Sequence, residues 1–226
     1  MINALNSIDK RKTINRYTSR FNEFGFSPKT LGWAKGNQDV RFFALTHDLM
    51  LNNRNICDVG CGFGDLYDYT SKRNALNNYY GIDLVDKLVK KGRERHKNIK
   101  NFHVRCGDFL ENNSYYETLK IDYFIMSGIF NFNLDKQNNY EYLFSVIETA
   151  FNISNAGVSF DFLNENADFQ EELNFHYSPE KVLSFCYTLS RNVLLKSNYM
   201  PFETTITILK DDSFNKKSVF NTFLEG

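Results

Sequence analysis

The sequence predicts an α/β protein built on a doubly wound, mostly parallel sheet of seven strands. From Asn55 onward, short apolar runs alternate with amphipathic segments, which is the pattern of strands joined by helices. A glycine-rich turn follows the first run, as at the ligand-binding edge of an open α/β sheet. The last two runs leave no room for a helix between them, so we expect the last strand to be antiparallel.

Two helices are predicted ahead of the sheet. Residues 8–24 place apolar side chains at nearly helical spacing, and Gly25 and Pro28 end that helix. A second helical pattern covers residues 37–51. We therefore expect residues 1–54 to form an N-terminal helical lid or extension and residues 55–226 to form the ligand-binding domain, together one compact unit.

The same alternation sets the expected element boundaries. The runs expected as strands are Ile56–Val59, Tyr79–Ile82, Phe102–Cys106, Ile121–Met126, Gly157–Phe162, Val193–Leu195 and Thr204–Leu209. The segments expected as helices are Leu66–Arg73, Val85–Lys97, Asn138–Phe151 and Pro179–Ser190. The last helix has a clear start signal, because Ser178 suits the N-cap and Pro179 the first helical position.

Composition argues against several classes of protein. The 226 residues carry 27 Lys plus Arg and 27 Asp plus Glu, and this balance disfavours a protein built for nucleic-acid phosphates or a polybasic membrane surface. No apolar run is long enough to span a bilayer, and the first residues lack the pattern of a signal peptide. The four cysteines show neither a disulfide framework nor zinc spacing. We expect reduced thiols, no bound metal and a cytoplasmic location.

The most informative segment is the turn after the first strand, Ile56-Cys-Asp-Val-Gly-Cys-Gly-Phe-Gly-Asp-Leu66. Glycines at alternate positions let a ligand approach the backbone without interference from a Cβ atom. A dinucleotide-binding turn needs a glycine where Asp65 stands, and an acid at this helix N-terminus would repel a pyrophosphate. With Asp58 just before the turn, the site suits a cationic or zwitterionic ligand such as S-adenosylmethionine.

Asp58-Val-Gly-Cys-Gly-Phe-Gly64 resembles the first motif of class I S-adenosylmethionine-dependent methyltransferases. Three further segments match at the expected intervals: Tyr80-Gly-Ile-Asp83-Leu84, Cys106-Gly-Asp108-Phe109 and Ile121-Asp-Tyr-Phe-Ile-Met-Ser127-Gly-Ile-Phe130-Asn131. The resemblance covers about residues 50–210 and implies the Rossmann-like fold of that family.

The resemblance also implies a cofactor, S-adenosylmethionine, and its product, S-adenosylhomocysteine. In the family, the acid at the position of Asp83 binds the ribose hydroxyls, and the acid at the position of Asp108 holds the adenine amino group. The residues expected at the cofactor are Asp58, Gly60, Cys61, Gly62, Gly64, Asp83, Leu84, Asp108, Phe109 and Ser127.

The head of the chain resembles a subgroup of small bacterial methyltransferases. The shared segments are Leu31-Gly-Trp33 with Gln38 and Arg41-Phe42, then Ser127-Gly-Ile-Phe-Asn131, Tyr177-Ser-Pro-Glu180 and Tyr199-Met-Pro-Phe-Glu203. The subgroup often accompanies surface-polysaccharide pathways, which implies a role in capsule modification but names no substrate.

Methyl transfer depends mainly on alignment and desolvation, and a hydroxyl acceptor usually needs a general base as well. The catalytic candidates are His176 and Tyr177, which precede the last helix, and Asp161, which lies in the fifth strand near its end. The substrate-binding candidates are Tyr17, Trp33, Gln38, Arg41 and Asn131. Arg41 suits the methionine carboxylate or an anionic substrate. Packing is an equally good interpretation of Trp33, as is a solvated position for Arg41.

These observations predict O-methylation of a small anionic or sugar-derived metabolite. The segment Ser127–Asn131 lacks the Asn/Asp-Pro-Pro-Tyr/Phe motif of nucleic-acid amino methyltransferases. A basic face with Lys10, Lys12, Arg16 and Arg20 leaves an RNA or protein methyltransferase open, and the undefined base leaves a catalytically silent cofactor-binding subunit open. We expect a small-molecule acceptor, no nucleic acid, no membrane, and a monomer or homodimer.

Overall fold

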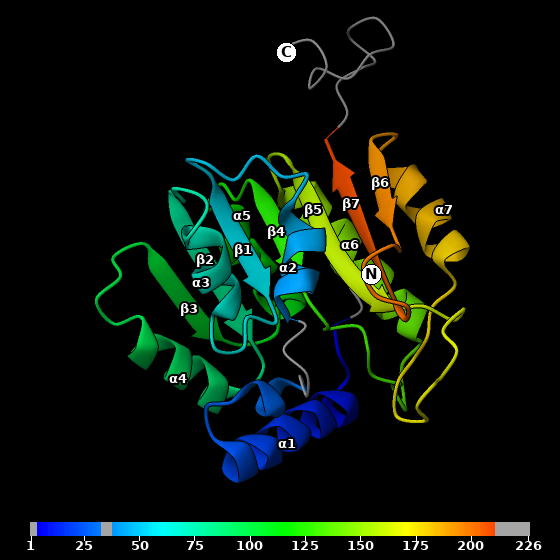
Figure 1. Ribbon diagram of the computed structural model, residues 1–226, viewed down its shortest axis with the longest axis horizontal. Coiled ribbons are helices and arrows are strands. Elements are labelled where there is room, and N and C mark those ends of the chain that lie inside the picture. The colour runs from blue at the N-terminus through cyan, green and yellow to red at the C-terminus, as the bar shows by residue number, and fades with distance from the viewer. Residues whose placement is uncertain (1–3, 33–37, 211–226) are drawn as a thin grey trace, which may run out of the picture.

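A seven-stranded sheet forms the centre of the computed structural model, which describes residues 4–32 and 38–210 (Figure 1). Its strands are β1 (Asn55–Val59), β2 (Asn78–Asp83), β3 (Phe102–Cys106), β4 (Tyr123–Met126), β5 (Gly157–Leu163), β6 (Val193–Lys196) and β7 (Glu203–Leu209). They lie in the order β3-β2-β1-β4-β5-β7-β6, and only β7 runs against its neighbours. The predicted α/β sheet with an antiparallel last strand is therefore confirmed.

Helices cover both faces of this sheet. On one face lie α2 (Gln38–Thr46), α3 (Asp65–Ser71) and α4 (Asp86–Arg95), and on the other α5 (Asn113–Glu117), α6 (Asn139–Ile153) and α7 (Pro179–Leu189). Because both faces are packed, β4 and β5 are buried along their whole length. The continuous apolar run of β4 predicts this burial, whereas β5 also buries the polar side chains of Ser159 and Asp161. The short helices α5, η1 (Pro28–Leu31) and η2 (Leu110–Asn112) were not predicted from the sequence.

Strand register brings the ends of three strands together. Val59 at the end of β1 pairs with Ile82 of β2 on one side and with Met126 of β4 on the other. Each parallel strand therefore ends at the same edge of the sheet. This places the glycine turn between the loop that begins at Asp83 and the loop that begins at Ser127.

The first helix, α1 (Ser7–Phe24), lies across this edge rather than on a face of the sheet (Figure 1). Asn6 caps its N-terminus, and Gly25 ends it at φ 61°. Its Tyr17 and Phe21 pack on a small apolar cluster, Phe63, Val85 and Leu88, beside the glycine turn. By contrast, α2 packs on the sheet itself through Phe42 and Leu45.

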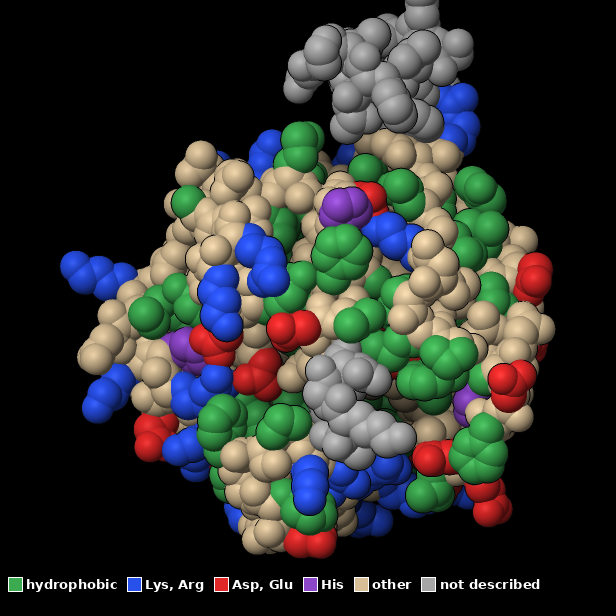
Figure 2. All heavy atoms as spheres, viewed as in Figure 1, with side chains coloured by type: hydrophobic (Ala, Val, Ile, Leu, Met, Phe, Trp, Pro, Cys, Tyr) green, Lys and Arg blue, Asp and Glu red, His purple; other side chains and the backbone are tan. Residues whose placement is uncertain are grey.

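The surface carries charges of both signs. Figure 2 shows acidic and basic side chains intermixed over the visible face, with several Lys and Arg side chains gathered at its lower end, over α1. Two basic residues of α1 form ion pairs within the molecule, Lys10 with Glu111 and Lys12 with Asp135. In the described parts of the chain, no helix has both the length and the apolar character needed to cross a membrane.

Candidate active site

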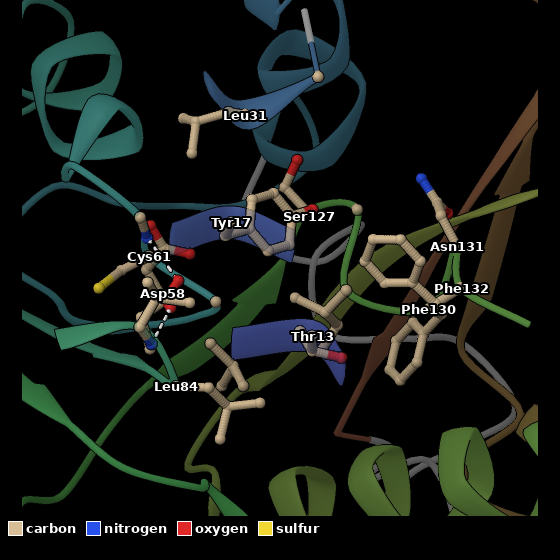
Figure 3. A pocket seen from close by; sticks show the side chains of 18 of the residues that line it. Thr13, Tyr17, Leu31, Asp58, Cys61, Leu84, Ser127, Phe130, Asn131 and Phe132 are labelled. Atoms are coloured by element: carbon tan, nitrogen blue, oxygen red, sulfur yellow. Dashed lines mark hydrogen bonds between the residues drawn. The ribbon is translucent and has the colours of Figure 1, made fainter. Parts of the chain in front are cut away.

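A cavity of about 670 Å³ opens where the parallel strands end. One side consists of the glycine turn with Asp58, Cys61 and Leu84, and the other consists of the loop after β4 with Phe130, Asn131 and Phe132 (Figure 3). Thr13 and Tyr17 reach into the space between them from α1 (Figure 3). The cavity is thus enclosed by segments that are far apart in the sequence.

Backbone geometry explains the glycines of the turn. Gly60, Gly62 and Gly64 have backbone φ values of 81°, 50° and 81°. Residues other than glycine rarely adopt such positive φ values. A Cβ atom on Gly60 would also collide with the side chain of Ile129. The turn is held against the sheet because the backbone N–H of Gly60 donates to the carbonyl of Ile82 at 2.7 Å.

Three carboxylates converge on the cavity from three consecutive strands. Asp83, at the end of β2, accepts backbone N–H groups from Gly62 at 2.9 Å and Val85 at 2.8 Å. Asp58, in β1, is 3% exposed, and it accepts the hydroxyl of Tyr79 at 2.6 Å. Burial raises the pKa of Asp58 to about 7, and the hydrogen bond from Tyr79 opposes that rise.

The third carboxylate, Asp108, is already engaged by α1. Its Oδ1 accepts the backbone N–H of Leu110 at 3.0 Å, and its Oδ2 lies 3.1 Å from the ammonium group of Lys10. Lys10 also reaches Glu111 at 2.6 Å. No local sequence pattern connects Lys10 with Asp108, since 98 residues separate them.

The loop after β4 is fixed by a buried acid in β5. The backbone N–H of Gly128 donates to Asp161 at 2.7 Å, and Gly128 itself has φ 71°. Further along this loop, the Oδ1 atom of Asn131 is buried and, within the described structure, lacks a hydrogen-bond partner. Such an atom is available to accept a hydrogen bond from a ligand.

Arg41 lines the cavity but is held by two acids. Its guanidinium donates to both carboxylate oxygens of Glu203, with Nε 2.8 Å from Oε2. The same Nε lies 3.4 Å from Oδ2 of Asp161. All three side chains are buried, so this cluster ties α2 to β5 and to the start of β7.

Most of the predicted site residues line the cavity. They are Tyr17, Gln38, Arg41, Asp58, Gly60, Cys61, Gly62, Asp83, Leu84, Asp108, Phe109, Ser127 and Asn131. Gly64 and Asp161 are not among the lining residues, and Trp33 lies outside the described residues. Their roles toward a ligand remain predictions.

The structure does not bring His176 and Tyr177 to the cavity lining. Tyr177 is fully buried, and its hydroxyl donates to the carbonyl of Phe130 at 3.2 Å. His176 is half-buried, and burial lowers its pKa. Both positions follow from a β-bridge between Asn164 and Tyr177, which holds this segment against the core. The geometry therefore argues against the catalytic roles expected for these two residues.

Several lining residues were missed by sequence reasoning. They are Thr13, Arg16, Leu31, Phe132, Glu171, Asn174, Phe202 and Glu203. A signal existed for α1, because Lys10, Thr13 and Tyr17 recur at i, i+3 and i+7 and so share one helix face. In the described residues, no three His, Cys, Asp or Glu side chains are grouped closely enough to hold a metal ion.

Comparison with known proteins identifies the family. The family described as "Methyltransferase domain" matches residues 51–201, about two thirds of the chain. The chain belongs to this methyltransferase family. A protein of Mycobacterium tuberculosis named "Putative methyltransferase Rv1506c" is 29% identical over 163 residues, which is 69% of this chain and 92% of that protein.

Solved methyltransferase structures share the architecture. Magnesium protoporphyrin IX methyltransferase from Synechocystis PCC 6803, crystallised with S-adenosylmethionine, matches 92% of this methyltransferase and 99% of its own chain, with a TM-score of 0.61 and 16% identity. The plantazolicin methyltransferase BamL, crystallised with S-adenosylhomocysteine and a desmethylPZN analog, covers 89% and 97%, with a TM-score of 0.59 and 12% identity. The predicted Rossmann-like methyltransferase fold is confirmed.

Proposed function

We propose that this methyltransferase uses S-adenosylmethionine to methylate an oxygen atom of a small anionic or sugar-derived metabolite. The observation that carries the cofactor half of this proposal is the convergence of Asp58, Asp83 and Asp108 around the glycine turn. Carboxylates at this spacing suit a ligand that offers a cationic sulfonium, ribose hydroxyls and an adenine amino group. The solved relatives with bound S-adenosylmethionine or S-adenosylhomocysteine support the same cofactor.

The residues present fit that cofactor. The carboxylate of Asp83 accepts two hydrogen bonds from backbone N–H groups, and its remaining lone pairs are available to accept hydrogen bonds from ribose hydroxyls. Leu84 and Phe109 supply apolar surfaces next to Asp108 for an adenine ring. When bound, S-adenosylmethionine supplies an electrophilic methyl group, and the product is S-adenosylhomocysteine.

Cavity size limits the acceptor. Ligand pockets for one drug-sized molecule usually measure about 300–1,000 Å³. This cavity of about 670 Å³ would have to hold both cofactor and acceptor, which favours a small acceptor. Its walls on the acceptor side are mostly aromatic, with Tyr17, Phe130 and Phe132, which favours a ring-shaped acceptor lying against them (Figure 3).

Transfer at this site consists of one displacement. The acceptor oxygen forms a bond to the methyl carbon as the carbon–sulfur bond breaks, and the bonding electrons remain on sulfur. The side chains contribute by aligning the two partners and by excluding water, effects that amount to several kcal/mol in well-oriented cases. A carboxylate or phosphate oxygen needs no base, whereas a hydroxyl must also release its proton to a neighbouring group.

The sequence signatures further suggest surface-polysaccharide modification in the cytoplasm, by a monomer or homodimer. An RNA or protein acceptor is the alternative. It is less favoured, because two of the four cations on the basic face, Lys10 and Lys12, are paired with acids of this chain. A radiolabelled methyl group that appears in RNA or protein would nevertheless favour that alternative.

The first experiment is a thermal melt with S-adenosylmethionine, S-adenosylhomocysteine and NAD in parallel. At a concentration of about 100 times Kd, a ligand stabilises the folded state by about 2.7 kcal/mol. For a chain of this length, that corresponds to a rise in Tm of roughly 5–10 °C. We expect the rise with the two adenosyl ligands only, and turnover to S-adenosylhomocysteine in the presence of a suitable acceptor. A rise with NAD alone would contradict the proposal, and binding without turnover of any acceptor would favour a silent subunit.

A further inference from the structure

We propose that Arg16 is the anion-binding residue of the acceptor site, so that the acceptor carries a carboxylate or phosphate group. The inference rests on the proposed function and narrows it to the anionic class of acceptors. The sequence predicts an anion contact at Arg41, and we assign this contact instead to Arg16 in α1.

Arg16 is the cation of the cavity that lacks an acidic partner. Among the described residues that line the cavity, Arg16 and Arg41 are the two with a permanent positive charge. The described part of the chain places no carboxylate within 4 Å of the Arg16 guanidinium. Instead, this group lies over the ring of Phe132, with Cζ 4.3 Å from the ring centre. Stacking on an aromatic face leaves the edge of a guanidinium, which carries its N–H donors, available to an anion.

Phe132 places Arg16 on the acceptor side of the cavity. It follows Asn131 in the loop after β4, opposite the glycine turn (Figure 3). Tyr17 meets the same ring edge-to-face, with ring centres 5.8 Å apart, so two consecutive residues of α1 pack against Phe132. Arg16 is therefore held in place by the wall that the acceptor would contact.

Arg41 is unsuited to the same task. Its guanidinium is buried between Glu203 and Asp161, and an anionic substrate would have to displace one of these carboxylates. Separating a buried ion pair leaves an uncompensated charge, which costs several kcal/mol. Arg16 can bind an anion without this cost in free energy, because no ion pair has to be separated.

The carboxylate on the acceptor side, Glu171, does not neutralise Arg16. Glu171 is exposed, and its Oε2 accepts the side-chain amide of Asn174 at 3.0 Å. Asn174 is in turn bridged to Phe132 through the backbone. Glu171 is thus held beside Phe132, and its carboxylate lies more than 4 Å from the guanidinium of Arg16.

The methionine part of the cofactor also ends in a carboxylate. Arg16 could therefore bind an anionic group of either the cofactor or the acceptor, and the experiment has to distinguish the two.

One arm of the experiment measures binding of S-adenosylhomocysteine and of 5′-methylthioadenosine, which lacks the amino-acid part, by calorimetry. The other arm measures the rise in Tm caused by inorganic phosphate at constant ionic strength, with S-adenosylhomocysteine present. Both arms compare the native protein with Arg16→Gln, Arg16→Lys and Arg11→Gln, the last an exposed arginine of the same helix.

We expect Arg16→Gln to bind both adenosyl ligands within about twofold of the native protein and to bind phosphate about 10- to 100-fold more weakly. Arg16→Lys, which keeps the charge, should retain part of the phosphate effect, and Arg11→Gln should retain all of it. The proposal is overturned if phosphate stabilises Arg16→Gln as strongly as the native protein, or has no effect on the native protein. It is also overturned if Arg16→Gln weakens S-adenosylhomocysteine alone, since Arg16 would then hold the cofactor carboxylate. Failure of the native protein to bind any adenosyl ligand would instead refute the proposed function.

Discussion

The ammonium group of Lys10 lies 3.1 Å from the carboxylate of Asp108, which joins the first helix to the end of the third strand. The carboxylate is buried, and the lysine is about one fifth exposed. Burial lowers the pKa of Lys10, but hydrogen bonds from Lys10 to Glu111 and Asp108 outweigh burial and leave that pKa raised. In this arrangement, α1 closes the cavity at the place where the family resemblance puts the adenine amino group.

Lys10→Met should therefore affect stability and ligand binding in opposite directions. The unliganded protein should lose about 1 kcal/mol, or roughly 2–4 °C in Tm, because Asp108 loses a partner. The rise in Tm caused by S-adenosylhomocysteine should become larger, because adenine no longer competes with Lys10. Lys12→Met, which removes an exposed pair with Asp135, is the matched control and should change neither quantity by more than about 1 °C. An unchanged ligand effect in Lys10→Met would show that Asp108 does not meet the adenine.

Asp83→Ala should abolish cofactor binding while the fold survives. The carboxylate holds the glycine turn through Gly62 and is proposed to bind ribose, and each charge-assisted hydrogen bond contributes about 1.5–3 kcal/mol. We expect calorimetry to show affinity for S-adenosylmethionine reduced by about 100-fold or more, with an unchanged circular dichroism spectrum. The control is Asp86→Ala, an exposed acid three residues further on. Full activity of Asp83→Ala would refute the assignment of the cofactor site.

Asp58 should couple cofactor binding to pH. Its folded-state pKa of about 7 lies above its ordinary value of 3.8, because burial disfavours the charged form. As pH rises from about 4 to 7, the unfolded chain releases this proton while the folded protein keeps it, so the unliganded protein loses stability until the loss is complete above pH 7.

A cationic ligand favours the ionised form of Asp58. Calorimetry should find that binding of S-adenosylmethionine tightens by about tenfold between pH 6 and pH 8. S-adenosylhomocysteine, which lacks the sulfonium charge, should respond less. Asp58→Asn removes the titrating group, so a profile for this variant as steep as that of the native protein would assign the pH dependence to another residue.

Glu203→Gln should destabilise the protein strongly. The substitution removes the carboxylate that accepts two hydrogen bonds from the buried guanidinium of Arg41, and breaking a buried ion pair typically costs 3–5 kcal/mol. For a chain of this size, Tm should fall by roughly 6–20 °C. Glu171→Gln, at an exposed acid of the same cavity, should shift Tm far less. If Glu203→Gln leaves Tm unchanged and only weakens binding of the acceptor, Arg41 serves the substrate rather than the fold.

The parts of the site that sequence reasoning predicted are those that follow from strand direction. Parallel strands end at one edge, so acids after consecutive strands, such as Asp83 and Asp108, meet there whatever the intervening helices do. The sheet was predictable for a similar reason, because strands buried on both faces have continuous apolar runs.

The parts that were missed depend on contacts between distant segments. Arg41 and Glu203 are 162 residues apart, and nothing in the local pattern of either residue indicates that they pair. Tyr177 was expected at the substrate because it lies between a strand and a helix, but its ring packs between Phe162 and Tyr140 in the core. Aromatic residues are compatible with both environments, so only the packing distinguishes them.

The antiparallel course of β7 has a consequence for biosynthesis. Because β7 runs against its neighbours, its first residue, Glu203, lies at the edge where the parallel strands end. During translation, Arg41 therefore emerges 162 residues before its buried counter-ion. At about 5–20 residues per second, that interval is roughly 8–30 s. During this time the guanidinium of Arg41 lacks the carboxylate of Glu203, so the buried cluster that joins α2, β5 and β7 can be completed only when synthesis of the chain is nearly finished.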